Sequence, residues 1–166
     1  MKAASDGMNE QSIASCPARM RLSGKVFAVG GLWMFLLGVY FVLLRPALLP
    51  EDPRFMGTSL EVLRTAAPGL ERWLGHVFRV MGGFMIAAGT MTMLVAWSFL
   101  ASRAPGALLA LTVAGAAGVA LMSATNFLLQ SDFRWLLLAP ALLWLVGILC
   151  YLGEGIGRRP GSKEIA

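Results

Sequence analysis

The sequence predicts an all-α protein, a four-helix transmembrane bundle in up-down-up-down order with a short amphipathic helical loop between its first two spans. Hydrophobic residues make up 57% of the 166 residues and charged residues 14%, whereas soluble domains carry roughly 25% charged residues. The mean hydropathy is +0.70. Four long runs are free of Asp, Glu, Lys and Arg, and a helix needs roughly 20 apolar residues to cross a bilayer.

The four runs predict spans at about 26–44, 78–102, 105–130 and 134–153, within a transmembrane domain of residues 25–154. A membrane barrel would instead show short alternating segments. We expect residues 1–24 and 155–166 to be polar cytoplasmic tails and residues 45–77 to be an extracytoplasmic loop. The later connections are short, so successive helices should be antiparallel neighbours.

Basic residues indicate the orientation of the chain. Eight of the fourteen flank the ends of the predicted spans on one side: Lys2, Arg19, Arg21, Lys25, Arg103, Arg158, Arg159 and Lys163. By the positive-inside rule, both termini are then cytoplasmic. The remaining six are arginines on the opposite side, and the basic residues form no single patch, which argues against a nucleic-acid partner. Two cysteines, Cys16 and Cys150, show no spacing typical of redox or metal chemistry.

The loop between the first two spans has a helical pattern of its own. Leucine and alanine recur at spacings of three and four from Leu60 to Leu74. Thr58 and Glu61 match a capping box, and Pro68 suggests a second short helix that opens near it. The segment is either a lid over the outer mouth of the bundle or a connector resting on lipid headgroups, and its pattern favours the connector.

Small residues predict where the helices pack. Gly82 and Gly83 with Ala87 in the second span, and Ala114 with Gly118 in the third, place small residues about four apart. Such spacing lets membrane helices approach closely. We therefore expect the second and third helices to form the tight centre of the bundle, although the same faces, including Ala116, Ala120 and Ala124, could meet another protomer.

Polar residues at the outer end of the second and third spans form a candidate ligand pocket: His76, Arg79, Ser123, Asn126, Gln130 and Asp132. An arginine near a span must find a partner, and histidine is able to titrate near neutral pH. The competing interpretation is that the arginine reaches lipid phosphates and the amides join helices by hydrogen bonds. This second interpretation is favoured, because a lone histidine and an arginine at the boundary of a span are common without any chemistry. A nucleophile triad is unsupported, since the sequence has one histidine and no serine in a recognisable elbow.

No catalytic residue, metal site or cofactor follows from the sequence. The methionines of the second span lack a second histidine or a nearby cysteine, and Gly30-Gly31 and Gly82-Gly83 lie within spans where no phosphate loop forms.

The order of features supports a family resemblance. A first span ends before a proline, an amphipathic connector follows, and a basic residue precedes a glycine pair and two more small residues: Pro46, Arg79, Gly82, Gly83, Ala87 and Gly89. This plan resembles the DoxX-like small bacterial four-helix membrane proteins. The resemblance implies a bacterial cytoplasmic (inner) membrane protein, and quinone-linked redox systems for some members, but it carries no catalytic residue.

The function that these patterns favour is a non-enzymatic accessory or assembly subunit, or a homo-oligomer, whose partners are the lipid bilayer and other membrane subunits or itself. The alternative is a membrane module that binds a lipid-like ligand or quinone, with Arg79 and Asn126 orienting the head group. A small transporter ranks last, because the polar groups gather at one end and do not line any span.

Overall fold

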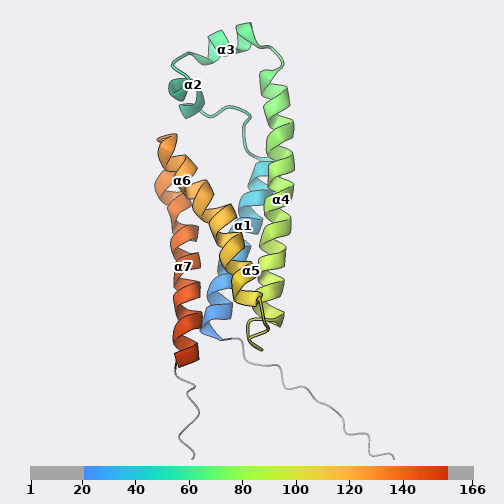
Figure 1. The fold of residues 1–166 in the computed structure, drawn as a ribbon. Helices are drawn as coiled ribbons and strands as arrows, with labels where there is room; N and C mark the ends of the chain where they lie inside the picture. The colour runs from blue at the N-terminus through green and yellow to red at the C-terminus, as the bar shows by residue number, and fades with distance from the viewer. Residues whose placement is uncertain (1–20, 157–166) are drawn as a thin grey trace, which may run out of the picture.

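A computed structural model describes residues 21–156, and every regular element in that range is helical. The predicted tails therefore lie largely outside the described residues, as does Cys16. The elements are α1 (Leu22–Leu43), α2 (Glu51–Phe55), α3 (Leu60–Ala66), α4 (Leu70–Ser98), α5 (Ala107–Ala114), the π-helical η1 (Gly115–Ala120), α6 (Leu121–Leu128) and α7 (Arg134–Ile156) (Figure 1). Within the described residues, four helices are long and apolar enough to cross a membrane: α1, α4, the continuous segment α5–η1–α6 (the third long helix) and α7. The all-helical content confirms the all-α class.

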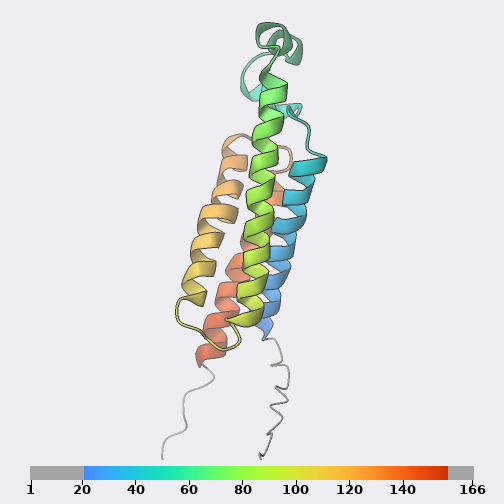
Figure 2. The ribbon, with the colours of Figure 1, turned by 90° about the vertical axis from the view of Figure 1, so that its right-hand side faces the viewer.

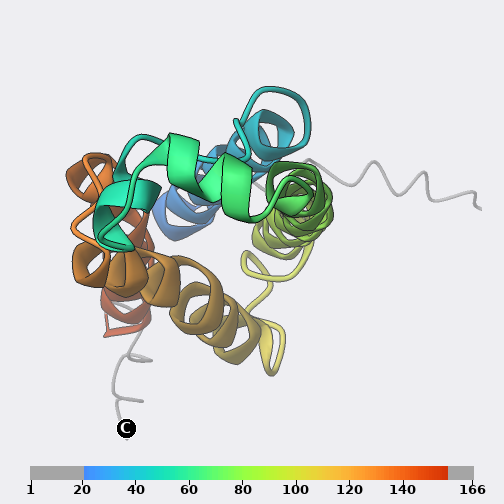
Figure 3. The ribbon, with the colours of Figure 1, turned by 90° about the horizontal axis from the view of Figure 1, so that it is seen from above.

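The long helices stand side by side. The long segment that carries α2 and α3 joins α1 to α4 at one end, a short loop follows α4 at the other end, and a short turn joins α6 to α7 at the first end (Figures 1 and 2). Helix α1 packs against α4 and α7, and α7 also contacts α6 and η1. The start of α1 and the end of α7 lie at the same end of the molecule (Figure 1). Seen from above, the segment with α2 and α3 crosses from α4 to the far side, where α6 and α7 lie (Figure 3).

Four glycines bring α1 and α4 into backbone contact. A Cβ atom on Gly82 would lie 2.7 Å from the Gly38 carbonyl oxygen, and one on Gly89 would lie 2.5 Å from the Gly31 carbonyl oxygen. Only a residue without a side chain fits where two helix backbones approach this closely. The expectation that the second and third helices form the tight centre is therefore wrong: the tight pair is α1 with α4.

The other predicted packing residues have different surroundings. Gly83 and Ala87 are exposed on α4, and nothing lies within 4 Å of a Cβ built on Gly83. Ala114 is partly buried and packs against the core, and a Cβ on Gly118 would touch the Met34 side chain of α1 at 3.5 Å. Gly82 is thus buried against α1 rather than against the third helix, whereas its neighbour Gly83 faces outward. One step along a helix turns the side-chain direction by about 100°.

Trp144 is the centre of the core. Its indole Nε1–H donates to the Leu111 carbonyl oxygen at 2.7 Å, and its ring meets Phe27 edge to face, with centroids 5.8 Å apart. The Trp144 ring also lies directly against Gly115, where the chain changes from α-helical to π-helical geometry. A side chain at this position would collide with the ring, so Gly115 lets one tryptophan join α1, α5 and α7.

The connector, residues 46–69 between α1 and α4, differs in detail from the pattern predicted for it. Ser59, rather than Thr58, caps α3, because the Ser59 Oγ accepts a hydrogen bond from the Val62 amide at 3.2 Å. Helix α3 ends at Ala66, before Pro68, as a proline favours. The second short helix is instead the first part of α4, which begins at Leu70 and continues without a break into the span that was expected to start at residue 78.

Candidate functional site

The structure does not gather the predicted polar pocket into one site. His76 and Arg79 are both exposed on α4. Ser123 is buried, and its hydroxyl donates to the Leu137 carbonyl oxygen of α7 at 2.6 Å. Asn126 uses its Nδ2 to donate to the Met122 carbonyl oxygen of its own helix at 2.9 Å. The Ser123 hydroxyl therefore joins α6 to α7, whereas the Asn126 amide bonds only within α6 and joins no second helix.

Gln130 and Asp132 lie in the turn between α6 and α7. Gln130 is exposed and adopts a positive φ of 50°, which allows the tight turn. Asp132 is also exposed and pairs with Arg54 of α2, with Nη2 and Oδ2 3.2 Å apart. The partner of Asp132 is thus an arginine of the connector, and no bond joins it to Arg79 among the described residues.

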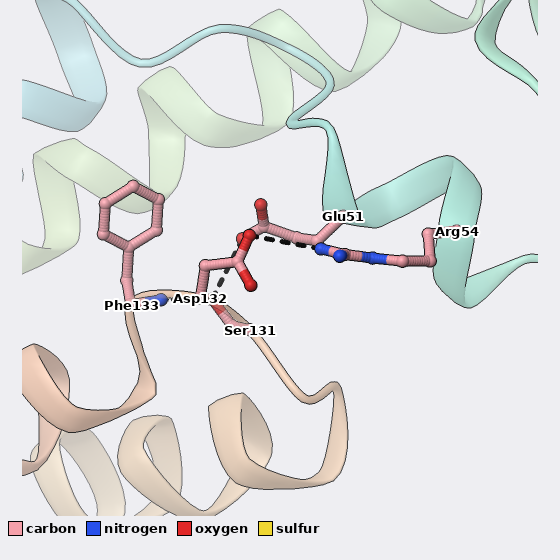
Figure 4. A network of polar contacts seen from close by, with 5 residues as sticks. All are labelled: Glu51, Arg54, Ser131, Asp132 and Phe133. Carbon is pink, nitrogen blue, oxygen red and sulfur yellow. Dashed lines mark hydrogen bonds and ion pairs between the residues drawn. The ribbon is translucent and has the colours of Figure 1, made fainter.

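The turn and α2 together form what we call the outer clasp: Glu51, Arg54, Ser131 and Asp132 (Figure 4). Its two buried members are joined directly, because the Glu51 carboxylate accepts a hydrogen bond from the Ser131 hydroxyl at 2.9 Å. Glu51 is 7% exposed and Ser131 4%. The Ser131 oxygen also accepts from the Phe133 amide at 3.2 Å. A buried carboxylate needs such bonds to offset its lost hydration, so this contact fixes α2 to the end of the α6–α7 pair.

The ion pair of the outer clasp adds less. The side chains of Arg54 and Asp132 are 64% and 65% exposed, and exposed pairs contribute roughly 0–1 kcal/mol. The serine–glutamate hydrogen bond is therefore the stronger of the two links. The Ser131 hydroxyl and the Glu51 carboxylate are both buried, so this link holds α2 in place and presents no open surface to a ligand.

Arg45 lies where α1 leaves its apolar run. Its guanidinium carbon is 3.4 Å from the centre of the Phe78 ring and 5.0 Å from that of Phe41, which places the cation over aromatic faces. Burial lowers the pKa of Arg45, and Asp52 opposes this shift. The contact binds the end of α1 to α4 just before the connector begins.

A small open cavity of about 120 Å³ lies under the connector, lined by apolar side chains and by the Arg64–Glu71 ion pair. Its size is below the roughly 300–1,000 Å³ of typical ligand pockets. Across residues 21–156, no three His, Cys, Asp or Glu side chains are grouped as metal ligands. The cavity and the outer clasp are thus separate features of the same end.

The opposite end has a second set of polar contacts that the sequence analysis missed. The Glu154 carboxylate accepts hydrogen bonds from the Ser23 amide at 3.0 Å and from the Ser23 hydroxyl at 2.8 Å, so α7 caps the first turn of α1. A carboxylate is favourable at a helix N-terminus. Arg103 donates to the Tyr151 carbonyl oxygen at 3.1 Å and lies 4.6 Å from the Tyr151 ring centre.

These contacts could have been found from the sequence only in part. Ser23 lies just before the first apolar run and Glu154 just after the last, so antiparallel packing would bring the two to one level. The outer clasp gave no such signal, because it requires α2 to fold across the molecule.

Taken together, four long apolar helices and polar contacts at the two ends indicate a multi-pass membrane protein. A scan against protein-family models and searches of curated proteins and of solved structures found no match. The function proposed below is therefore argued from the geometry of the chain.

Proposed function

We propose that this protein is a non-enzymatic, four-span protein of a bacterial cytoplasmic membrane that acts as a homo-oligomer or as an accessory subunit of a membrane assembly. The helices cross in up-down-up-down order with both termini in the cytoplasm. The excess of basic residues beside those ends supports this orientation. The bacterial cytoplasmic membrane is what the resemblance to DoxX-like proteins implies, and that resemblance rests on residues that include Arg79, Gly82 and Gly83.

One observation carries the proposal: a face of small residues on η1 and α6 that residues 21–156 leave uncovered. Ala116, Ala120 and Ala124 are four residues apart and all exposed, whereas Gly118 of the same segment packs inward. In lipid, small residues at this spacing promote helix association, because they let two backbones approach closely. The exposed alanines therefore suit a helix from a second protein chain.

A quinone between the second and third helices is not part of this proposal. Arg79 and Asn126 were its expected ligands, but Arg79 is exposed and the Asn126 amide is bonded within its own helix. Neither observation favours a head group between them.

The test is the mass of the particle in mild detergent, measured for the parent and for Ala120→Leu. A leucine at this position holds two helices apart, so the parent should be larger than one chain and the variant should be a monomer. Ala139→Leu is the matched control, since Ala139 is also exposed but lies on α7; it should leave the mass unchanged. A parent that is a monomer with no bound subunit contradicts the proposal.

A further inference from the structure

The outer end of α4 carries a stripe of exposed cationic and polar residues that the proposed function does not use. Arg72, His76 and Arg79 follow one another at spacings of four and three, which places them on one side of the helix. All three are exposed. We call them the α4 basic stripe.

The arginines of this stripe have no acidic partner within the described range. Of the ion pairs in residues 21–156, one joins Arg54 to Asp132 and the other joins Arg64 to Glu71. Glu71, the nearest acid in sequence, is therefore engaged by Arg64. The positive charge of Arg72 and Arg79 is free to attract an anion.

The remaining acids at this end make no ion pair with the stripe. The Glu51 carboxylate accepts from Ser131, and the Asp52 carboxylate accepts from the Leu49 amide at 2.7 Å. Glu61 is exposed on α3 and forms no ion pair in residues 21–156, so no carboxylate of the described range is paired with Arg72 or Arg79.

The register of α1 and α4 gives the depth of the stripe. Gly38 lies beside Gly82, and α1 ends at Leu43. At a rise of about 1.5 Å per residue, Leu43 is about 7.5 Å outward from this crossing and Arg79 about 4.5 Å outward. By the same rise, His76 lies about 9 Å outward and Arg72 about 15 Å outward.

These levels match the boundary of a bilayer. Arg79 lies just inside the end of the apolar run of α1, from which a long side chain reaches the headgroups. His76 lies near that end, and Arg72 lies about 7.5 Å beyond it, at the outer edge of a headgroup layer that is roughly 5–7.5 Å thick on each side. The three side chains thus follow the course of a lipid headgroup and its phosphate.

The surface below the stripe is suited to an acyl chain. Gly83 is four residues from Arg79 on the same side of α4, and nothing lies within 4 Å of a Cβ built there. Val80 and Phe84, 62% and 72% exposed, flank it with apolar surface. A lipid with its phosphate on the arginines would place its first chain over this open position.

We propose that the α4 basic stripe, Arg72, His76 and Arg79, is a binding site for an anionic phospholipid, whose phosphate pairs with the two arginines and whose acyl chain lies over Gly83. This proposal rests on the membrane-spanning part of the proposed function and is independent of self-association. It differs from a pocket between the second and third helices, because the site faces the surrounding lipid.

Native mass spectrometry in mild detergent tests the site, with phosphatidylglycerol and phosphatidylcholine added in turn. The parent should retain phosphatidylglycerol in preference to phosphatidylcholine. Arg72→Gln with Arg79→Gln should weaken that retention roughly fivefold for each charge removed, or roughly 25-fold for both. Arg72→Lys with Arg79→Lys should retain most of it, because the charges remain.

The matched control removes two charges from the same end of the protein, away from the stripe. Arg54→Gln with Arg134→Gln should leave retention unchanged, since Arg54 already pairs with Asp132 and Arg134 begins α7. Inorganic phosphate added alone should not displace the lipid. A parent with no preference for the anionic lipid, equal loss in the test and control variants, or displacement by phosphate alone would each overturn the proposal.

The same spectra count the chains in each particle. A monomer that still retains phosphatidylglycerol through Arg72 and Arg79 contradicts self-association and supports the lipid site, whereas an oligomer without selective retention does the reverse.

Discussion

The contact between α1 and α4 is the most sensitive packing feature, and Gly89→Ala perturbs it directly. A Cβ atom on Gly89 would lie 2.5 Å from the Gly31 carbonyl oxygen and 2.6 Å from the Phe35 amide nitrogen. Both neighbours are backbone atoms, so no side-chain rotation relieves the contact. Non-bonded carbon atoms prefer about 3.5–4.0 Å, so the two helices must separate by about 1 Å.

The expected effect is a loss of stability. Overpacking a well-packed interface costs about 1–3 kcal/mol, and the separation also weakens the neighbouring contact of Gly38 with Gly82. Alanine has a higher helix propensity than glycine by up to about 1 kcal/mol, which offsets part of the loss. We therefore expect the free energy of unfolding to fall by about 1–2 kcal/mol.

Gly83→Ala is the matched control on the same helix. A Cβ there meets nothing within 4 Å, so only the propensity term remains and stability should be unchanged or slightly higher. Unfolding is followed by circular dichroism as sodium dodecyl sulfate is titrated into mixed micelles. Equal unfolding free energies for the Gly89→Ala and Gly83→Ala variants would refute the close backbone contact.

Two further predictions concern the core and the outer clasp. Trp144→Phe should lower the free energy of unfolding by about 1 kcal/mol or more, because its hydrogen bond is lost. Trp97→Phe, at a side chain 73% exposed, should change it little. Thermal unfolding followed by circular dichroism compares the two variants, and equal effects would argue against the buried bond. Ser131→Ala leaves the buried Glu51 carboxylate without its hydroxyl donor. This variant should therefore speed amide hydrogen exchange in residues 51–55 more than Arg54→Ala, which removes only the exposed ion pair. The opposite order would show that the ion pair is the main link.

Part of this fold could be predicted because its cause is local. An uncharged apolar run has few alternatives to a membrane helix, so the four long helices follow from composition and length. The break at Pro68 was equally local, since a proline disfavours helical geometry at the residue before it. Ser59 was missed in favour of Thr58 because both are good capping residues one position apart, and sequence spacing resolves helix ends only to a residue or two.

The helix partners were harder to predict, because small residues show which faces are able to pack but not against which helix. Small residues four apart in the second and third spans predicted the wrong pair of helices. The glycines at the contact are seven residues apart within each helix: Gly31 and Gly38 in α1, and Gly82 and Gly89 in α4. Seven residues are nearly two helical turns, so this matched spacing in two spans was the signal that could have found the pair.

The candidate pocket failed for a related reason. Its residues share a level on the second and third helices, but their direction depends on the rotation of each helix about its axis. Ser123 turned inward to α7, whereas His76 and Arg79 turned outward. The outer clasp could not be predicted either, because it joins residues about eighty positions apart through a connector whose path the sequence does not specify.

The central proposal is that four helices cross the membrane in alternating directions with both termini inside, and labelling of single cysteines tests it most directly. In a chain carrying Cys16→Ser and Cys150→Ser, one cysteine is placed at each connection in turn, with Val62→Cys, Ser102→Cys and Gln130→Cys, all at exposed positions. A membrane-impermeant maleimide is then applied to right-side-out bacterial membrane vesicles. Cysteines at 62 and 130 should react in intact vesicles and the cysteine at 102 only after permeabilisation, whereas labelling of all three from one side would contradict the four-span topology.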